Sequence, residues 1–369
     1  MARQVSEGIQ VPDAAHQRTR MTFSDILDQE RLRIDKDMDS VLTTHDAYPF
    51  LKTIHHYNKA FCADGGKRLR PILLRHVYAA CGGKGDVSRE SLCVELMHNS
   101  TLVHDDIMDE DLLRRGRATV VAMLKDHKVR HPGREQQHMG PLFNDDTSKF
   151  AISQAILAGS MLYALGARTL SASPLNASVL KRALDIYHDS YDLILEGQVM
   201  DICFEQDEVT VPQYMDMISL KTATLIRASA RIGCTLAEAP VEVEDALSEY
   251  ATHMAIAFQI QDDIMDFDED GGKGRSAGRD LAQGKKTLPI LLALEQASGH
   301  ERAAIVSALG KHAGRDAMDS VRRLGVPQSA TIAQKHVQQS LTQLARAEKT
   351  IRAQPFLRDL ARYMTTRKK

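Results

Sequence analysis

The pentapeptide Asp-Asp-Ile-Met-Asp occurs twice in this chain, at Asp105–Asp109 and again at Asp262–Asp266. In a helix, side chains four residues apart lie roughly 40° from each other around the axis, so the first and last aspartates of each copy share a face. Like charges one turn apart repel by roughly 0.2–0.5 kcal/mol per pair, so two such clusters favour a bound cation. The repeat therefore predicts two carboxylate faces that hold hard divalent cations between them, and Mg²⁺ suits carboxylates, water and substrate phosphates.

Paired aspartates on a helix usually lie on a solvated surface, and one Asp-Asp-x-x-Asp motif alone is weak support for a function. The setting of these two copies is different. Val103 precedes the first copy, and Phe258 and Ile260 precede the second. Duplication in apolar surroundings favours a functional site over a solvated surface.

Composition and charge narrow the class of protein. The chain has 369 residues, of which 43% are hydrophobic and 26% charged, as in globular proteins. A net charge of −2 gives no electrostatic case for binding nucleic acid or an anionic membrane surface. No apolar run approaches the roughly 20 residues of a membrane-spanning helix, and the polar N-terminal stretch lacks a signal-peptide core. We expect a soluble cytoplasmic protein without a transmembrane segment.

Helical periodicity dominates the chain from Phe23 to the C-terminus, with apolar residues at i, i+3 and i+4 and no convincing strand pattern. The prediction is an all-α fold, with residues 23–369 forming a single domain built as a large helical bundle. Residues 1–22 lack periodicity and are expected to be a disordered tail. The polar stretch Val121–Lys149, which contains Pro132-Gly133, is expected to be a surface insertion.

Basic segments accompany the aspartate clusters. Gly65–Pro71 places Lys67 and Arg70 at the start of a predicted helix, where backbone amides and basic side chains can bind a diphosphate. A helix C-cap followed by a basic first turn is the alternative for this segment. Arg114-Arg115-Gly116, soon after the first cluster, suits a guanidinium clamp on an anion, or else a solvated helix end.

The second cluster is followed by a basic loop broken by glycines, up to Lys285. The chain contains no Gly-x-Ser-x-Gly motif and no Walker motif, so acyl transfer by a serine and P-loop hydrolysis are unsupported. A site that handles a diphosphate through metal and basic side chains remains the better interpretation.

Taken together, these segments resemble the trans-isoprenyl diphosphate synthases, the chain-elongating prenyltransferases. The resemblance runs from about Leu51 to Leu294, and the motifs that carry it are GGKRLRP at 65–71, LVHDDIMDEDLLRRG at 102–116, EGQVMD at 196–201, LKTATL at 220–225, FQIQDDIMDF at 258–267 and GRDLAQGKKTLP at 278–289. It implies an all-α bundle around a central apolar cavity with both aspartate clusters at its mouth. It also implies isoprenyl diphosphate substrates, about three Mg²⁺ ions per active site and a homodimer.

The resemblance implies roles for individual residues, motif by motif. The metal ligands would be Asp105, Asp106, Asp109, Asp262 and Asp266. The isopentenyl diphosphate site would comprise Lys67, Arg70, His98 and Arg115. Contacts to the allylic diphosphate would come from Arg114, Lys221, Thr222, Gln259, Arg275 and Lys285, where Arg275 replaces the lysine usual in the family. The residues expected to carry catalysis are Asp105, Asp109, Asp262, Lys221 and Arg114.

Product length depends on what closes the cavity below the first cluster. Short-product members of the family carry aromatic residues where this chain has Ser100 and Thr101, so a deeper cavity is expected. Met97 lies eight residues before Asp105, about 12 Å along a helix, and is the candidate floor. The preferred product is geranylgeranyl diphosphate (C20), with C25 or longer products and a C15 product as alternatives.

Two other classes of protein share parts of this pattern. A class I terpene cyclase also uses an aspartate cluster and Mg²⁺, but it usually has a different second motif and many aromatic cavity residues. A non-catalytic subunit of a heteromeric synthase typically lacks one cluster. Both copies are complete here and aromatic residues make up only 5% of the chain, so a catalytic synthase is favoured.

Overall fold

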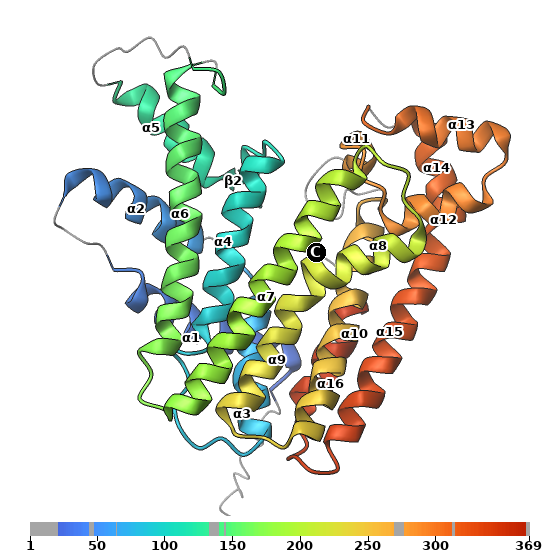
Figure 1. The fold of residues 1–369 in the computed structure, drawn as a ribbon. Coiled ribbons are helices and arrows are strands. Elements are labelled where there is room, and N and C mark those ends of the chain that lie inside the picture. Colours follow the sequence, from blue (N-terminus) through green and yellow to red (C-terminus); the bar gives the residue numbers. More distant parts are fainter. Residues whose placement is uncertain are drawn as a thin grey trace, which may run out of the picture.

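The computed structural model describes residues 21–43, 48–63, 65–132, 140–143, 145–268, 277–311 and 314–366, without the side chains of Pro49 and Phe50. The all-α prediction is confirmed for these residues (Figure 1). The helices are α1 (Phe23–Val41), α2 (Pro49–Ala63), α3 (Leu69–Ala80), α4 (Leu92–Met108), α5 (Val120–Arg130), α6 (Asp146–Ser171), α7 (Ala177–Phe204), α8 (Val211–Ile218), the π-helix η1 (Ser219–Ala223), α9 (Thr224–Leu236), α10 (Val241–Met265), α11 (Arg279–Ala282), α12 (Leu288–Gln296), α13 (Gly299–Ala308), α14 (Arg315–Leu324), α15 (Val326–Ala347) and α16 (Pro355–Thr366).

Local sequence signals set several helix ends. Thr22 caps α1 and forms a reciprocal capping box with Asp25, and Thr210 does the same with Gln213 at α8. Thr22 therefore caps the first helix, which begins at Phe23, the residue where helical periodicity was expected to start. Residues 1–20, the rest of that expected tail, lie outside the described residues.

The helices pack as a bundle whose two aspartate-bearing helices are both central. α4, which carries the first cluster, packs against α6, and α10, which carries the second, packs against α9 and α15 (Figure 1). α9 contacts both α4 and α10 and links the two halves. Fully buried side chains precede the aspartates on each helix, such as Leu96 on α4 and Ile260 on α10, so packing holds the two helix ends in place.

Residues 121–149, expected to be a surface insertion, contain regular structure. α5 covers residues 120–130, and its Val120 and Leu124 are buried in the core because they face α4 and α6. The other side chains of α5 and those of residues 146–149 are partly or fully exposed, so the location of this segment at the surface stays a prediction, whereas its helices were not expected. Residues 133–139 and 144 lie outside the described residues.

A short hairpin was not foreseen. The strands β1 (Leu113–Arg114) and β2 (Arg117–Ala118) pair antiparallel just after the first aspartate cluster. The turn residues Arg115 and Gly116 both have positive φ, 53° and 78°, as a two-residue hairpin turn of type I′ requires. An Arg-Gly pair flanked by only two residues on each side is too short to show strand periodicity.

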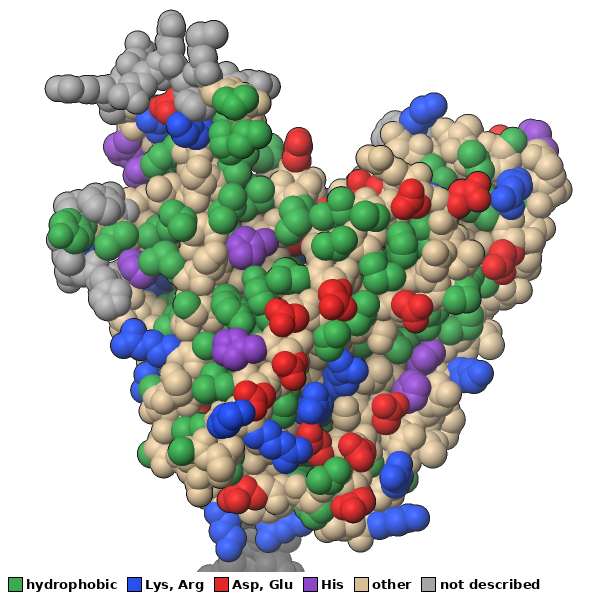
Figure 2. Space-filling model, viewed as in Figure 1, with side chains coloured by type: hydrophobic (Ala, Val, Ile, Leu, Met, Phe, Trp, Pro, Cys, Tyr) green, Lys and Arg blue, Asp and Glu red, His purple; other side chains and the backbone are tan. Residues whose placement is uncertain are grey.

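α6 is the one helix of the described chain that is long and apolar enough to cross a membrane by length and composition, a result that the sequence reading did not anticipate. Only 33% of its most apolar window is buried. Its exposed face carries Ile156 and Leu157, and the neighbouring α7 exposes Leu195, Val199 and Ile202. Figure 2 shows hydrophobic side chains gathered over this face of the molecule.

Candidate active site

One cavity of about 850 Å³ collects the predicted site residues from segments far apart in the chain. It opens where Figure 2 shows the molecule hollowed, between the hairpin and α11. The predicted residues that line it are Lys67, Arg70, His98, Thr101, Asp105, Asp109, Arg114, Arg115, Lys221, Thr222, Gln259, Asp262, Asp266 and Lys285. Asp106 lies behind this lining, and Arg275 lies outside the described residues.

The first cluster ends α4, and its aspartates differ in surroundings. Asp105 accepts from Lys221 at 3.2 Å and from Arg114 at 3.1 Å. Burial acts to raise the pKa of Asp105, but these cations and Lys285 outweigh it and the pKa is lowered. Asp106 is 1% exposed, and burial raises its pKa to about 6 despite the 2.6 Å bond that Arg114 Nε donates to it.

The hairpin turns two adjacent arginines to different partners. Arg114 bridges Asp105 and Asp106 through separate guanidinium nitrogens. The Arg115 guanidinium lies beside Gly66, where a Cβ added to the glycine would be 3.3 Å from Nη1. Arg114 thus lies at the aspartate end of the cavity and Arg115 at the Gly65-Gly66 end. The sequence motif alone does not show that the two arginines have different partners.

Lys221 lies in η1, a single π-helical turn between α8 and α9. Such turns redirect side chains and are frequent at functional sites. Its ammonium group binds Asp201 of α7 at 2.6 Å as well as Asp105, and Thr222 donates to Gln259 of α10 at 3.1 Å. Burial acts to lower the pKa of Lys221, but both aspartates outweigh it and the pKa is raised, so the side chain is a permanent cation.

Close backbone contact places this π-turn. A Cβ added at Gly197 of α7 would lie 2.3 Å from the Lys221 backbone nitrogen, so any larger residue must displace η1. We expect Gly197→Ala to lower kcat roughly tenfold to a hundredfold, because a shift of about 1 Å in a charged catalytic group has that cost. Steady-state kinetics would measure the change.

Gly299→Ala is the matched control, because nothing lies within 4 Å of the added Cβ at that position. An unchanged kcat in the Gly197 variant would show that the position of the π-turn does not limit turnover.

The second cluster ends α10 and is more deeply buried. Asp263 is 4% exposed and accepts a bond from Gln259 at 2.9 Å and another from the Tyr214 hydroxyl. Burial and the nearby Asp280 raise its pKa well above the usual range. Asp262 faces the cavity, and Asp266 accepts the backbone N–H of Asp280 at 3.0 Å. Asp263 is thus engaged in holding the helix end, while Asp262 faces the substrate space.

Two ion pairs join the segment after the second cluster to the first cluster. Lys285 binds Asp109 at 3.1 Å, and Arg279 of α11 binds both oxygens of Asp111, at 2.5 and 2.6 Å. The Asp111–Arg279 pair was not among the predicted site contacts. Each partner belongs to a separate segment, and the sequence carries no local signal that they meet.

The Gly65-Gly66 end of the cavity has a buried structural arginine beside the two predicted binding residues. Arg68 is 2% exposed at its side chain and donates to Asp35 at 2.8 Å, to Glu95 at 2.7 Å and to the Cys62 carbonyl. Its φ of 50° turns it away from the helix that Leu69 begins. Arg68 therefore anchors α1 and α4, and it lines the cavity together with Lys67 and Arg70.

The binding residues at this end are desolvated cations and a neutral imidazole. Burial lowers the pKa of Arg70 to about 10, and its Nε has no partner among the described residues. Burial and the surrounding arginines hold the pKa of His98 well below its usual value. Lys67 Nζ lies 5.2 Å above the ring of Tyr363 in α16. This group offers positive charge and hydrogen-bond donors to a second anion.

The carboxylates fit Mg²⁺ by their chemistry. Their hard oxygen donors line the cavity at both helix ends, and Asp106 Oδ2 is buried without a partner in the described structure. Among the described side chains, no three from His, Cys, Asp and Glu are placed to hold an ion by themselves. This arrangement suits a cation whose shell is completed by substrate phosphates and water rather than by protein alone.

Of the three residues predicted to set product length, only one lines the cavity. Thr101 lines the cavity, whereas Ser100 and Met97 are fully buried and do not. Met97 packs instead in a cluster that includes Tyr187 of α7 and Leu225 of α9. Ile194 and Leu225 line the cavity from the facing helices. The wall next to Thr101 therefore comes from α4, α7 and α9 together.

An all-α bundle with two aspartate clusters and two sets of basic residues around one cavity defines a transferase that acts on isoprenyl diphosphates. The polyprenyl synthetase family model matches residues 51–324, and the chain belongs to this family of prenyltransferases. A geranylgeranyl diphosphate synthase of Saccharolobus solfataricus is 32% identical over 331 residues, which are 86% of this chain and 91% of that protein.

Two solved structures show the same fold. Geranylgeranyl pyrophosphate synthetase from Pyrococcus horikoshii matches with a TM-score of 0.77 at 27% identity, over 94% of this chain and 98% of that one. Geranylgeranyl pyrophosphate synthase from Corynebacterium glutamicum, complexed with isoprenyl diphosphate and magnesium, matches with a TM-score of 0.81 at 24% identity, over 94% of this chain and 100% of that one. The resemblance seen in the sequence motifs is thus confirmed by both sequence and fold.

Proposed function

We propose that this protein is a Mg²⁺-dependent synthase that condenses isopentenyl diphosphate with an allylic diphosphate and makes geranylgeranyl diphosphate. The observation that carries the proposal is the single 850 Å³ cavity that contains both aspartate clusters and two separate groups of cations. One group comprises Arg114, Lys221 and Lys285, beside the aspartates. The other comprises Lys67, Arg70 and Arg115, so one cavity has room and charge for two diphosphates.

Charge stabilisation explains how the first group acts. Arg114, Lys221 and Lys285 lie within hydrogen-bond distance of the first cluster, in a part of the cavity where most of the surrounding surface is buried. Positive charges fixed there stabilise the negative charge that develops on the allylic diphosphate as its C–O bond breaks. Bound Mg²⁺ supplies Lewis-acid stabilisation of the same charge, with Asp105, Asp106, Asp109, Asp262 and Asp266 as its ligands.

The second group orients the nucleophile. Arg70, Arg115 and Lys67 hold the isopentenyl diphosphate so that its double bond faces the allylic carbon, and His98 donates or accepts as a neutral imidazole. The double bond attacks the allylic cation, a new C–C bond forms, and a proton leaves the adduct to the released diphosphate. No protein base is required in this sequence of steps.

The C20 product is supported by the cavity wall and by a relative. Thr101 is small and lines the cavity where an aromatic side chain would close it, and Met97 lies buried one turn further from the aspartates. The Saccharolobus solfataricus relative is a geranylgeranyl diphosphate synthase. For a longer product, the growing isoprenoid chain would have to displace the side chains packed around Met97.

Product analysis tests the proposal directly. With Mg²⁺, labelled isopentenyl diphosphate and dimethylallyl, geranyl or farnesyl diphosphate, we expect one C20 alcohol after dephosphorylation, resolved by chromatography.

Thr101→Phe should shorten the product to C15, because the aromatic ring would block the part of the cavity that the growing isoprenoid chain must pass. Thr342→Phe, on the exposed side of α15, is the control.

A series of products longer than C20 would support the assignment as a synthase but contradict the role of Met97 as the floor of the cavity. Failure to consume isopentenyl diphosphate with every primer, or release of a cyclic hydrocarbon, would reject the synthase.

A homodimer and a cytoplasmic location belong to the same proposal. The exposed apolar side chains of α6 and α7 form one continuous face, which is the kind of surface that a second subunit covers. The cysteines Cys62, Cys81, Cys93, Cys203 and Cys234 are all free thiols, which supports a reducing compartment.

A further inference from the structure

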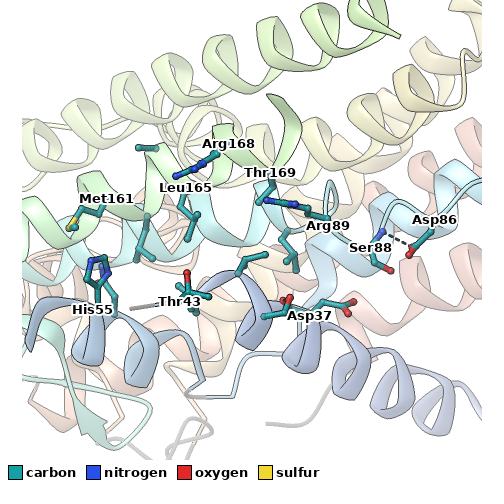
Figure 3. Close-up of a pocket in the computed structure, with 17 residues that line it drawn as sticks. Asp37, Thr43, His55, Asp86, Ser88, Arg89, Met161, Leu165, Arg168 and Thr169 are labelled. Atoms are coloured by element: carbon teal, nitrogen blue, oxygen red, sulfur yellow. Dashed lines mark hydrogen bonds between the residues drawn. The ribbon is translucent and has the colours of Figure 1, made fainter. Parts of the chain in front are cut away.

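A second cavity, of about 660 Å³, lies between α1, α2, the turn before α4 and α6 (Figure 3). It shares no lining residue with the active-site cavity. Its size is within the range of small-molecule sites. Along α4, Leu92 in the first turn lines this cavity, whereas the active-site cavity is lined by residues from Glu95 onward.

Unpaired positive charge lines this second cavity. Arg89, in the turn before α4, and Arg168, in the last turn of α6, have no carboxylate partner among the described residues, although both line the cavity. In Figure 3 their guanidinium groups lie on the same side of the cavity, near Thr169. A guanidinium presents a planar fork of donors that suits a carboxylate or phosphate.

The acidic residues of the cavity are already engaged. Asp37 accepts from Arg75 at 2.7 Å, and Arg75 also binds Ser91 and the Ser88 carbonyl. Asp86 accepts the backbone N–H of Ser88 at 2.9 Å, which lowers its pKa. Asp86 stays ionised, so Arg75, Arg89 and Arg168 together exceed Asp37 and Asp86 by one positive charge, which favours an anionic ligand.

The rest of the lining has an apolar part and a polar part, and the polar residues are Ser40, Thr43, His55, Asn58, Ser88 and Thr169. Leu42 of α1, Leu92 of α4 and Leu162 of α6 are buried side chains that face the cavity, and Met161 and Leu165 are half-buried beside them. Asn58 of α2, which is 3% exposed, also lines the cavity and donates to the Ala158 carbonyl, while its Oδ1 has no partner in the described structure. An apolar body with one anionic end matches this lining better than a free inorganic ion does.

We propose that this cavity binds an amphipathic anion, with a carboxylate or phosphate held between Arg89 and Arg168 and an apolar chain lying along α6. Because no residue is shared with the active site, the ligand binds there with the active site occupied or empty. The inference does not depend on the proposed product length. A straight-chain fatty acid and an isoprenyl monophosphate share this chemistry, and the experiment below separates them.

Photo-crosslinking locates the ligand without relying on affinity alone. The full-length protein would be labelled with a diazirine analogue of dodecanoate, with saturating Mg²⁺ and geranylgeranyl diphosphate present to occupy the active site. We expect mass spectrometry to find the label on peptides of α1 and α6 that contain Leu42 or Met161–Leu165. Competition by dodecanoate or by farnesyl monophosphate then identifies which apolar chain fits, and dodecanol and inorganic phosphate should compete poorly.

The variant Arg89→Ala/Arg168→Ala should weaken binding about tenfold, because both arginines are exposed and two exposed ion pairs of about 0.7 kcal/mol each add up to the roughly 1.4 kcal/mol of a tenfold change. Arg346→Ala/Arg352→Ala removes the same charge from exposed positions outside the cavity and should bind normally. Leu165→Trp should fill the cavity and abolish labelling while both arginines remain.

Labelling confined to active-site peptides would overturn the proposal. So would labelling that both cavity variants leave unchanged, or equal competition by the neutral alcohol. Each of these outcomes leaves the assignment of the prenyltransferase site intact, so the two proposals fail separately.

Discussion

Asp105→Asn and Asp262→Asn are each expected to lower kcat by about three orders of magnitude or more. The replacement keeps the shape of the side chain and removes the charge that faces the cavity from one cluster. Loss of one preorganised electrostatic contact in a buried site costs about 10²–10³ in rate, and loss of a metal ligand adds to this. Asp105 also pairs with Lys221 and Arg114, so among the described residues its loss leaves Lys221 held by Asp201 alone and Arg114 held by Asp106 alone.

Single-turnover assays with labelled isopentenyl diphosphate would measure the effect. Asp189→Asn is the control, because Asp189 is exposed on α7 and lies outside the cavity lining. A variant that retains more than a tenth of the wild-type rate would show that its cluster is not required for ionisation. A protein that lacks turnover as wild type and only modulates a partner would instead be a non-catalytic subunit.

Arg68→Met should lower the free energy of unfolding by about 3–5 kcal/mol, because it leaves the buried carboxylate of Glu95 without its cation. Both side chains are nearly inaccessible, at 2% and 4% exposed. The loss also frees Asp35 of α1 and the Cys62 carbonyl of α2, so the N-terminal helices lose a common anchor.

Urea unfolding followed by circular dichroism, at one protein concentration for all variants, would measure this loss. Arg33→Met is the matched control: its pair with Glu30 is exposed at 66% and 15%, and it should cost at most about 1 kcal/mol. A cost below about 1 kcal/mol for Arg68→Met would mean that Glu95 finds another donor or is protonated in the variant.

Features encoded by local pattern could be predicted from the sequence. The duplicated aspartate motif and the helical periodicity predicted the fold class, and the cavity gathers almost every predicted binding residue. In the basic segment at 65–71, Lys67 and Arg70 were predicted to face the ligand, and both line the cavity. Each of these residues lies in a short motif whose residue types alone indicate its chemistry.

Features that depend on contacts between distant segments could not be predicted from the sequence. Arg279 and Asp111 are 168 positions apart, and nothing local to either indicates the other. The helix α5 could not be predicted because its sequence is mostly polar, and only Val120 and Leu124 of it are buried. The depth of Met97 behind the cavity wall depends on α7 and α9, which spacing along α4 cannot reveal.

The hairpin has a consequence for how the two substrates meet. Arg114 holds the aspartate end and Arg115 lies at the Gly65-Gly66 end, and consecutive Cα atoms are about 3.8 Å apart. The two side chains therefore start from one rigid two-residue turn, and a shift of that turn would move contacts at both ends of the cavity together.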